Sequence, residues 1–254
     1  MANIISCRTG VFDTLEAAFE NFPKAGVYHA EAPPAPGGDY PAMAKLARRH
    51  GVTIATLATH VVLDSETTAA ELLPVIDGAQ RIGVPRLFVS AQAAPQVPWE
   101  MVIARLRQAA EYAFAHKVII CMETHPPFGA NGEMARKTLT AVGHPGLRFN
   151  FDTANIYYYN QGTDTVAELE KVADLVASVH LKDTDGGFQS PIFPPIGAGV
   201  VDFRSVFRIL AKVGFSGPYT LEIEGDNVTP LDAAGRQQFL RTCVDYLHRV
   251  GAME

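Results

Sequence analysis

Glycine repeatedly closes a helix-like stretch in this chain, and a run rich in β-forming residues begins within a few residues after it. The pattern occurs at Gly26, Gly51, Gly83, Gly146 and Gly214. Glycine suits the left-handed residue that caps a helix, after which the chain can turn back into a strand. The recurrence therefore predicts a series of strand and helix units that alternate along the whole chain.

Eight segments are expected to be strands, at residues 4–7, 27–31, 52–58, 86–90, 118–123, 147–152, 176–182 and 219–224. Helical patterns lie between them, at residues 14–22, 41–50, 67–82, 99–116, 134–142, 163–174, 203–213 and 233–250. Eight strand-then-helix units favour a closed parallel (β/α)8 TIM barrel of the α/β class. An open doubly wound sheet is the alternative, but no GxGxxG motif follows the first strand.

The length and composition agree with one soluble catalytic barrel. The chain has 254 residues and a mass of 27.4 kDa, a common size for a TIM barrel, so we expect one domain over residues 1–254. No apolar run approaches the roughly 20 residues that cross a bilayer. The first ten residues lack a basic leader, and we expect a cytoplasmic protein without a membrane partner.

Charge and cysteine usage argue against a nucleic-acid-binding protein and against paired cysteines. The net charge is −6 and the pI is near 5.7, which argues against the basic patch of a nucleic-acid-binding protein. Cys7, Cys121 and Cys243 are widely spaced and form no CxxC pair, so we expect reduced thiols.

Four successive strands in the second half each end in a side chain that can bind a metal. These residues are Glu123, Asp152, His180 and Glu222. One Glu or Asp after a strand more often starts a loop or caps a helix, but a barrel brings all of its strand ends to one face. A charge at the end of a buried strand is costly unless something neutralises it. Three carboxylates and one imidazole therefore predict a divalent cation.

The ligand types restrict the metal without identifying it. Carboxylates favour hard cations and one imidazole widens the choice, so the set suits Mn²⁺, Mg²⁺ or Co²⁺, with Zn²⁺ and Fe²⁺ as further options. We expect one divalent ion, with Mn²⁺ as the first choice.

A second group of polar residues is expected to contact the substrate. Lys182 and Glu224 share a strand face with His180 and Glu222, because side chains alternate along a strand. The other candidates at the strand ends are Glu31, His60 and His125. The alternative role for Lys182 is a salt bridge with Asp183 or Glu224. The alternative role for His125 is a structural hydrogen bond.

At these positions the chain resembles the xylose isomerase-like barrels that are grouped as sugar phosphate isomerases/epimerases. The resemblance covers nearly the whole chain. Its clearest segments are METH at 122–125, FDTAN at 151–155, VHLKD at 179–183, GAG at 197–199, VDF at 201–203, GFSG at 214–217 and LE at 221–222. Similar members include ketose 3-epimerases, hydroxypyruvate isomerase, inosose dehydratase and dehydroshikimate dehydratase. The resemblance implies one metal held by Glu123, Asp152, His180 and Glu222.

The resemblance also implies a reaction on a small carbohydrate. A sugar isomerase or epimerase of this family transfers a proton next to a ketone through a metal-bound enediolate, with Glu123 and Glu222 as the metal-ligating acid/base pair. The alternative is a metal-dependent lyase or dehydratase that acts on a keto-polyol or keto-glycoside by β-elimination. A non-catalytic binding barrel is a third reading. Barrels of this family often pair, so a homo-oligomer is an open expectation.

Two features depart from the family pattern or leave a choice open. Many members carry a histidine three residues beyond the Asp ligand, where this chain has Asn155, an amide that can contact substrate but cannot act as a base. The related DNA-repair endonucleases need that histidine, so a nuclease is disfavoured. The Gly- and Pro-rich segment 184–201 is expected to cover the substrate. Within it, Gly197 and Gly199 are turn glycines or a phosphate-binding backbone.

Overall fold

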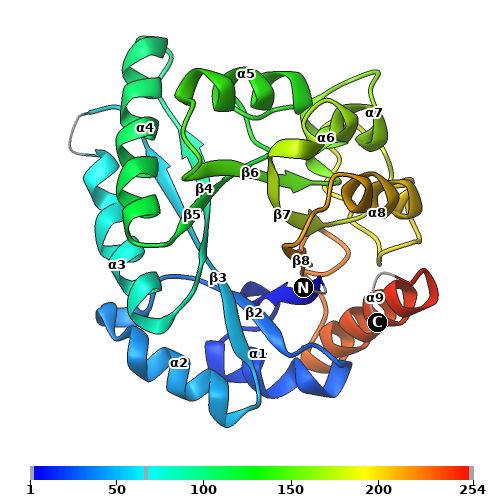
Figure 1. Ribbon diagram of the computed structural model, residues 1–254. Helices are drawn as coiled ribbons and strands as arrows, with labels where there is room; N and C mark the ends of the chain where they lie inside the picture. Colours follow the sequence, from blue (N-terminus) through cyan, green and yellow to red (C-terminus); the bar gives the residue numbers. More distant parts are fainter. Residues whose placement is uncertain (1–2, 66–67, 252–254) are drawn as a thin grey trace.

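The protein is a closed barrel of eight parallel strands, seen here in a computed structural model that describes residues 3–65 and 68–251. The strands are β1 (Ile4–Arg8), β2 (His29–Ala32), β3 (Thr53–Val62), β4 (Arg86–Gln92), β5 (Ile119–Glu123), β6 (Leu147–Asp152), β7 (Val176–Leu181) and β8 (Pro218–Leu221). They pair in sequence order, and β1 closes the barrel against β8. Helices surround the strands (Figure 1). The predicted TIM barrel is confirmed.

The helices occupy the predicted intervals with three differences. They are α1 (Leu15–Asn21), α2 (Tyr40–Arg49), α3 (Leu73–Ile82), α4 (Trp99–Ala115), α5 (Gly132–Val142), α6 (Asn155–Tyr159), α7 (Thr165–Glu170), α8 (Phe203–Lys212) and α9 (Ala233–Arg249). The short helix α6 lies in no predicted interval. The helix expected at 67–82 begins at Thr67, outside the described residues, and Thr68–Leu72 is a 3-10 turn. The helix expected at 163–174 is split, because Val172 leaves the helical region with φ −138° and ψ 1°.

The glycine pattern is confirmed at four of its five positions. Gly26, Gly51, Gly83 and Gly214 have φ between 71° and 84°, the left-handed conformation of a helix cap. Gly146 was assigned wrongly, because Gly143 caps α5 with φ 61°. The prediction failed there because Gly143 and Gly146 lie close together in sequence, and only the backbone conformation shows which of them is left-handed.

The two faces of β6 separate polar from apolar residues as predicted. Phe149 and Phe151 are fully buried and belong to the hydrophobic core. On the opposite face of the same strand, Asn150 accepts a hydrogen bond of 2.7 Å from the hydroxyl of Ser178 on β7. This polar face therefore lines the barrel interior, and Asp152 continues it at the carboxyl end.

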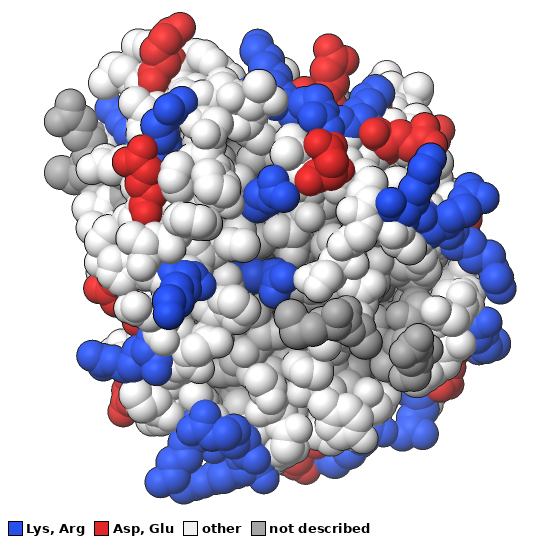
Figure 2. Space-filling view, in the orientation of Figure 1, with Lys and Arg blue, Asp and Glu red and all other residues white. Residues whose placement is uncertain are grey.

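The surface seen in Figure 2 carries charges of both signs. Among the described residues in this view, acidic and basic side chains are mixed around the edge, and the centre is covered mainly by other residues. None of the helices in residues 3–65 and 68–251 is both long and apolar enough to cross a membrane.

A buried aspartate fastens the segment that follows β7. The carboxylate of Asp183 is 1% exposed and accepts hydrogen bonds from the amides of Thr184, Gly197, Gly199 and Val201, at 2.8 to 3.2 Å. The amides of both glycines are therefore engaged within the protein. Of the two roles left open for Gly197 and Gly199, the structure supports that of turn glycines. Their backbone amides donate to Asp183 and are not available to a phosphate.

Because the loop is held by these hydrogen bonds to Asp183, we predict that Gly199→Ala destabilises the protein. A Cβ at Gly199 would lie 2.2 Å from the carbonyl oxygen of Thr184 and 2.4 Å from a carboxylate oxygen of Asp183. We expect a loss of about 1–3 kcal/mol in the free energy of unfolding, measured by urea denaturation. Gly10→Ala is the matched control, because a Cβ there meets nothing within 4 Å. Equal stability of the two variants would contradict this account of the loop.

Candidate metal centre

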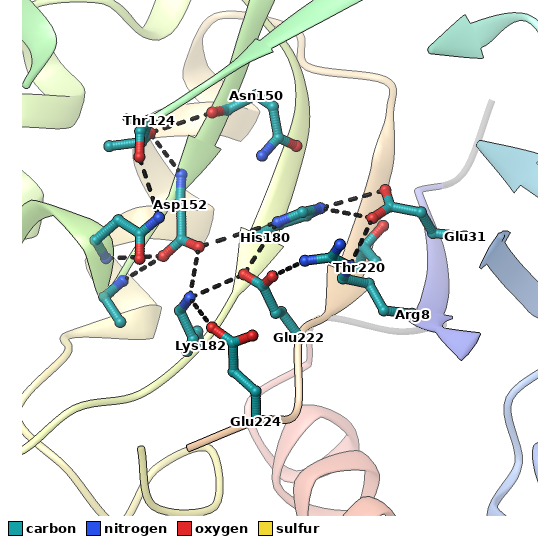
Figure 3. A network of polar contacts seen from close by, with 12 residues as sticks. Arg8, Glu31, Thr124, Asn150, Asp152, His180, Lys182, Thr220, Glu222 and Glu224 are labelled. Atoms are coloured by element: carbon teal, nitrogen blue, oxygen red, sulfur yellow. Dashed lines mark hydrogen bonds and ion pairs between the residues drawn. The ribbon is translucent and has the colours of Figure 1, made fainter. Parts of the chain in front are cut away.

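Three of the four predicted metal ligands converge at the carboxyl end of the barrel. Asp152, His180 and Glu222 each offer one ligand atom, and these atoms lie within 4.8 Å of one another. Asp152 ends β6 and pairs in register with His180 on β7, while Glu222 directly follows β8. All three side chains are buried. Figure 3 shows them pointing toward one another.

The two oxygens of the Asp152 carboxylate have different partners. Oδ1 accepts hydrogen bonds from the amides of Ala154 and Asn155, at 2.8 and 2.9 Å. Oδ2 is buried without a hydrogen-bond partner, although the Nζ of Lys182 lies 3.2 Å away as an ion pair. Burial raises the pKa of Asp152 to about 7. A buried carboxylate oxygen that faces two other ligand atoms fits a divalent cation.

The imidazole of His180 is held from both sides. Its Nε2 lies 3.0 Å from a carboxylate oxygen of Glu31, and its Nδ1 lies 3.2 Å from Oε2 of Glu222. The ring stacks on Phe88 with 4.6 Å between centroids. Burial alone would lower the pKa of His180, but the charges of Glu31 and Glu222 outweigh it and raise the pKa to about 10. Glu31 thus orients the ring so that Nδ1 faces the other ligands, a common arrangement behind metal-binding histidines.

Two basic side chains neutralise the carboxylates. Lys182 is 3% exposed, and its Nζ lies 2.9 Å from both Glu222 and Glu224. Arg8 forms ion pairs with Glu222 and with Glu31, the latter at 3.3 Å. Burial favours the protonated form of Glu222, but Lys182 and Arg8 outweigh it and hold its pKa well below the usual range. The Lys182–Glu224 salt bridge considered from the sequence is present.

Glu123 lies beside this group rather than within it. Within the described residues, the three-residue cluster does not include Glu123, which ends β5. Burial raises its pKa, and the charge of Glu222 adds to this effect. Glu123 and Glu222 therefore differ in proton affinity although both face the same space.

That space is a cavity of about 350 Å³. Its lining residues are Arg8, Glu123, Asn155, Tyr158, Tyr159, Lys182, Pro191, Phe193, Glu222, Glu224 and Gly225. The cavity brings together three predicted substrate contacts, Asn155, Lys182 and Glu224. The amide nitrogen of Asn155 donates to the carbonyl of Thr124 at 3.0 Å, which fixes its side chain at the wall.

Three predicted contacts lie outside this lining: His60, His125 and Glu31, whose carboxylate contacts His180 instead. The third strand was expected to end at residue 58, before His60, and this is wrong: β3 continues to Val62 because its pairing with β4 extends to Gln92. His60 is exposed and pairs in register with Ser90. His125 has Nδ1 at 2.5 Å from the carbonyl oxygen of Pro126, and its ring packs edge-on against Tyr159.

Arg8, Phe88 and Phe193 complete the site and were not predicted. Arg8 ends β1 on the same face as Ser6, so the strand-end pattern used for the acidic residues would have found it. Phe88 reads as an ordinary core residue. Phe193 contacts Lys182, with Nζ at 4.9 Å from the ring centroid, and comes from an irregular segment that carries no periodic signal.

The fold and the site place the chain in one family. A family model described as the xylose isomerase-like TIM barrel matches residues 9–243. The chain therefore belongs to the xylose isomerase-like TIM barrel family, as its sequence motifs predicted.

Curated relatives match part of the chain. An inosose dehydratase from Yersinia enterocolitica is 26% identical over 144 residues, which cover 50% of this chain and 48% of the relative. The L-ribulose-5-phosphate 3-epimerase UlaE from Escherichia coli K12 is 29% identical over 119 residues, which cover 46% of this chain and 40% of the relative. The matched segments thus span about half or less of the relatives' own length. Both relatives are enzymes.

Solved structures share the fold over nearly the full length. A xylose isomerase domain protein from Planctomyces limnophilus has a TM-score of 0.81 at 20% identity, covering 98% of both chains. The IOLI protein with a bound zinc atom has a TM-score of 0.79 at 18% identity, covering 98% of this chain and all of that one. A Mycobacterium smegmatis barrel in complex with magnesium has a TM-score of 0.73 at 17% identity, covering 97% of this chain and 98% of that one. These likenesses show the fold.

We predict that the purified protein binds about one divalent ion per chain and that its ligand variants do not. Asp152→Asn, His180→Ala and Glu222→Gln should lose the ion, because each removes an atom of the three-residue group. Glu123→Gln should retain more metal than these three, because Glu123 lies beside the group. Elemental analysis after Mn²⁺ reconstitution measures the content. A full complement of metal in His180→Ala would contradict the site.

Metal affinity should rise with pH. The pKa of Asp152 is raised to about 7 and that of His180 to about 10, and both groups must lose a proton to bind a cation. Binding should release about two protons below pH 7 and about one above it, so the dissociation constant should fall more than about tenfold between pH 6 and 8. Calorimetry in buffers of different ionisation enthalpy counts these protons. A flat profile would contradict the assignment.

Proposed function

We propose that this protein is a divalent-metal-dependent sugar isomerase or epimerase that moves a proton next to a carbonyl group. The observation that carries the proposal is the buried group of Asp152, His180 and Glu222, in which Oδ2 of Asp152 has no hydrogen-bond partner, beside a cavity that Glu123 also lines. A small polyhydroxylated substrate suits this cavity because its wall offers several carboxylates, an amide and an ammonium group. The epimerase name of one relative agrees with this reaction.

Asp152, His180 and Glu222 would hold the cation, and Glu123, at the end of β5, lines the same cavity beside them. The bound ion would supply charge stabilisation to the carbonyl oxygen as the adjacent proton leaves. Mn²⁺ is our first choice, and zinc and magnesium occur in the structures of similar barrels. Carboxylate-rich ligand sets accept all of these ions.

Glu222 and Glu123 suit the two halves of a proton transfer. Lys182 and Arg8 keep Glu222 ionised, so it can accept the proton next to the carbonyl. Glu123 holds a proton more readily because burial and the charge of Glu222 raise its pKa, so it can donate. Paired carboxylates whose pKa values are pushed apart are a common acid/base arrangement. Two such groups on different walls would exchange the proton between two faces of the substrate, which is epimerisation.

Asn155, Lys182 and Glu224 would position the substrate. Asn155 is held by the carbonyl of Thr124, and Lys182 is held between Glu222 and Glu224. Their polar atoms can bind substrate oxygens, whereas the rings of Tyr159 and Phe193 would exclude water from the same wall.

Elimination is the second candidate function. Its first step is the same proton abstraction, after which a β-hydroxyl or β-alkoxyl group leaves. Two observations favour it: the match to an inosose dehydratase, and the presence of the Lys182 ammonium in the cavity, where it could protonate a leaving oxygen.

Solvent exchange tests the proposal. In D₂O, the Mn²⁺-loaded protein should place one deuteron on the carbon next to the carbonyl of a ketose, detected by mass spectrometry and NMR. Glu222→Gln and Glu123→Gln should each slow exchange by about 10²–10⁴-fold. Absence of exchange with every ketose and keto acid tested would overturn the proposal. Appearance of an enone or a released alcohol would assign the lyase reaction instead.

A further inference from the structure

A second cavity, of about 410 Å³, adjoins the first at the mouth of the barrel. Arg8, Glu222 and Glu224 line both cavities, so the two spaces meet along these residues. The first cavity contains Glu123 and Lys182, whereas the second does not. Its volume alone is within the range of about 300–1,000 Å³ that is usual for small-molecule sites. The mouth is thus larger than one monosaccharide requires.

Part of the wall of the second cavity is apolar. The cavity is formed by the segment after β1, by residues of β2 and β3, and by residues that follow β2 and β8. Val11, Phe12, Ala32 and Ile223 are less than 9% exposed and lie behind the apolar part, whereas Leu15, Pro33 and Ala58 are more accessible to an occupant. A surface of this kind packs against the C–H face of a ring.

The charged groups at the same cavity disfavour an anionic occupant. Four carboxylates line it, from Asp13, Glu31, Glu222 and Glu224, against the single guanidinium of Arg8. Arg8 is already paired with Glu31 and Glu222, whereas the cations paired with Asp13 and Glu224, Arg236 and Lys182, do not line this cavity. A carboxylate only accepts hydrogen bonds, so it binds hydroxyl donors and repels phosphate. The cavity therefore fits a neutral, hydroxyl-rich ring.

We infer that the second cavity binds a second, uncharged sugar ring, so that the substrate is an unphosphorylated glycoside of disaccharide size. The inference rests on the proposed function in one respect: the reacting sugar occupies the first cavity, between Glu123 and Glu222. The second ring then supplies binding energy remote from the reacting carbon, which an enzyme can use to orient the reacting sugar.

Gly10 offers a way to fill the second cavity without disturbing the first. It lines the second cavity in the turn Thr9–Val11, and a Cβ there meets nothing within 4 Å. Pro33 is exposed and lines the same cavity from the segment after β2. Gly10→Trp and Pro33→Trp would therefore obstruct the space from two sides. Gly10→Ala is the matched control, since one methyl group removes little volume.

Binding of ketose disaccharides tests the inference. The probes are D-fructose, D-fructose 6-phosphate, and lactulose and isomaltulose, which carry a second ring on different hydroxyls of fructose. Calorimetry with the Mn²⁺-loaded protein should show at least one disaccharide bound about tenfold or more tightly than fructose. Gly10→Trp or Pro33→Trp should remove that gain and leave fructose binding within about twofold. Gly10→Ala should keep the gain.

The outcomes separate this inference from the proposed function. Disaccharides that bind no better than fructose, or a gain that survives both tryptophan variants, would overturn the second subsite. Tighter binding of fructose 6-phosphate than of both disaccharides would also overturn it. Loss of the gain in the blocked variants supports the subsite even when no sugar exchanges deuterium, and that last result would count against the proposed reaction alone.

Discussion

Neutralisation of buried carboxylates is the constraint on which the carboxyl end of this barrel depends. Asp152, Glu222 and Glu31 are nearly inaccessible to water and lie around one imidazole. Like charges in such a place repel one another and lose their hydration, so they persist only with cations beside them. Lys182 and Arg8 supply positive charge, and the carboxylates in turn raise the pKa of His180.

The same balance would suit the proposed divalent ion. One oxygen of Asp152 accepts hydrogen bonds from backbone amides and the other has no hydrogen-bond partner, while Glu31 orients the imidazole of His180 so that Nδ1 faces it. These side chains are therefore already oriented, which would lower the reorganisation that ion binding requires. Asp152 and His180 lie on strands and Glu222 directly follows one, whereas the walls of both cavities include loops. A change in the loops could therefore alter the choice of substrate without moving these three side chains.

The two cavities at the mouth of the barrel have different proposed roles. The first contains the pair of glutamates whose proton affinities differ, as the proposed proton transfer requires. The second combines apolar residues with more carboxylates than cations, as the proposed binding of a neutral ring requires. Epimerisation and elimination share their first step. Which of them follows depends on whether a side chain of the cavity wall can protonate the leaving oxygen.

The sequence by itself determined the barrel and the residues at its strand ends. Alternation of strands and helices has a local cause in hydrophobic periodicity and glycine caps, and strand parity placed Asp152, His180 and Glu222 on one inner face. Lys182 and Glu224 followed from the same parity, and their ion pair was among the roles considered.

Only the tertiary structure decided how these residues are arranged around one another. It separated Glu123 from the three-residue group, placed Glu31 behind His180, brought Arg8 from the other end of the chain to Glu222, and kept His60 within an extended β3. It also showed that Asp183 uses the amides of Gly197 and Gly199. Local patterns cannot show these arrangements, because distances between side chains on different strands depend on the register and closure of the whole barrel.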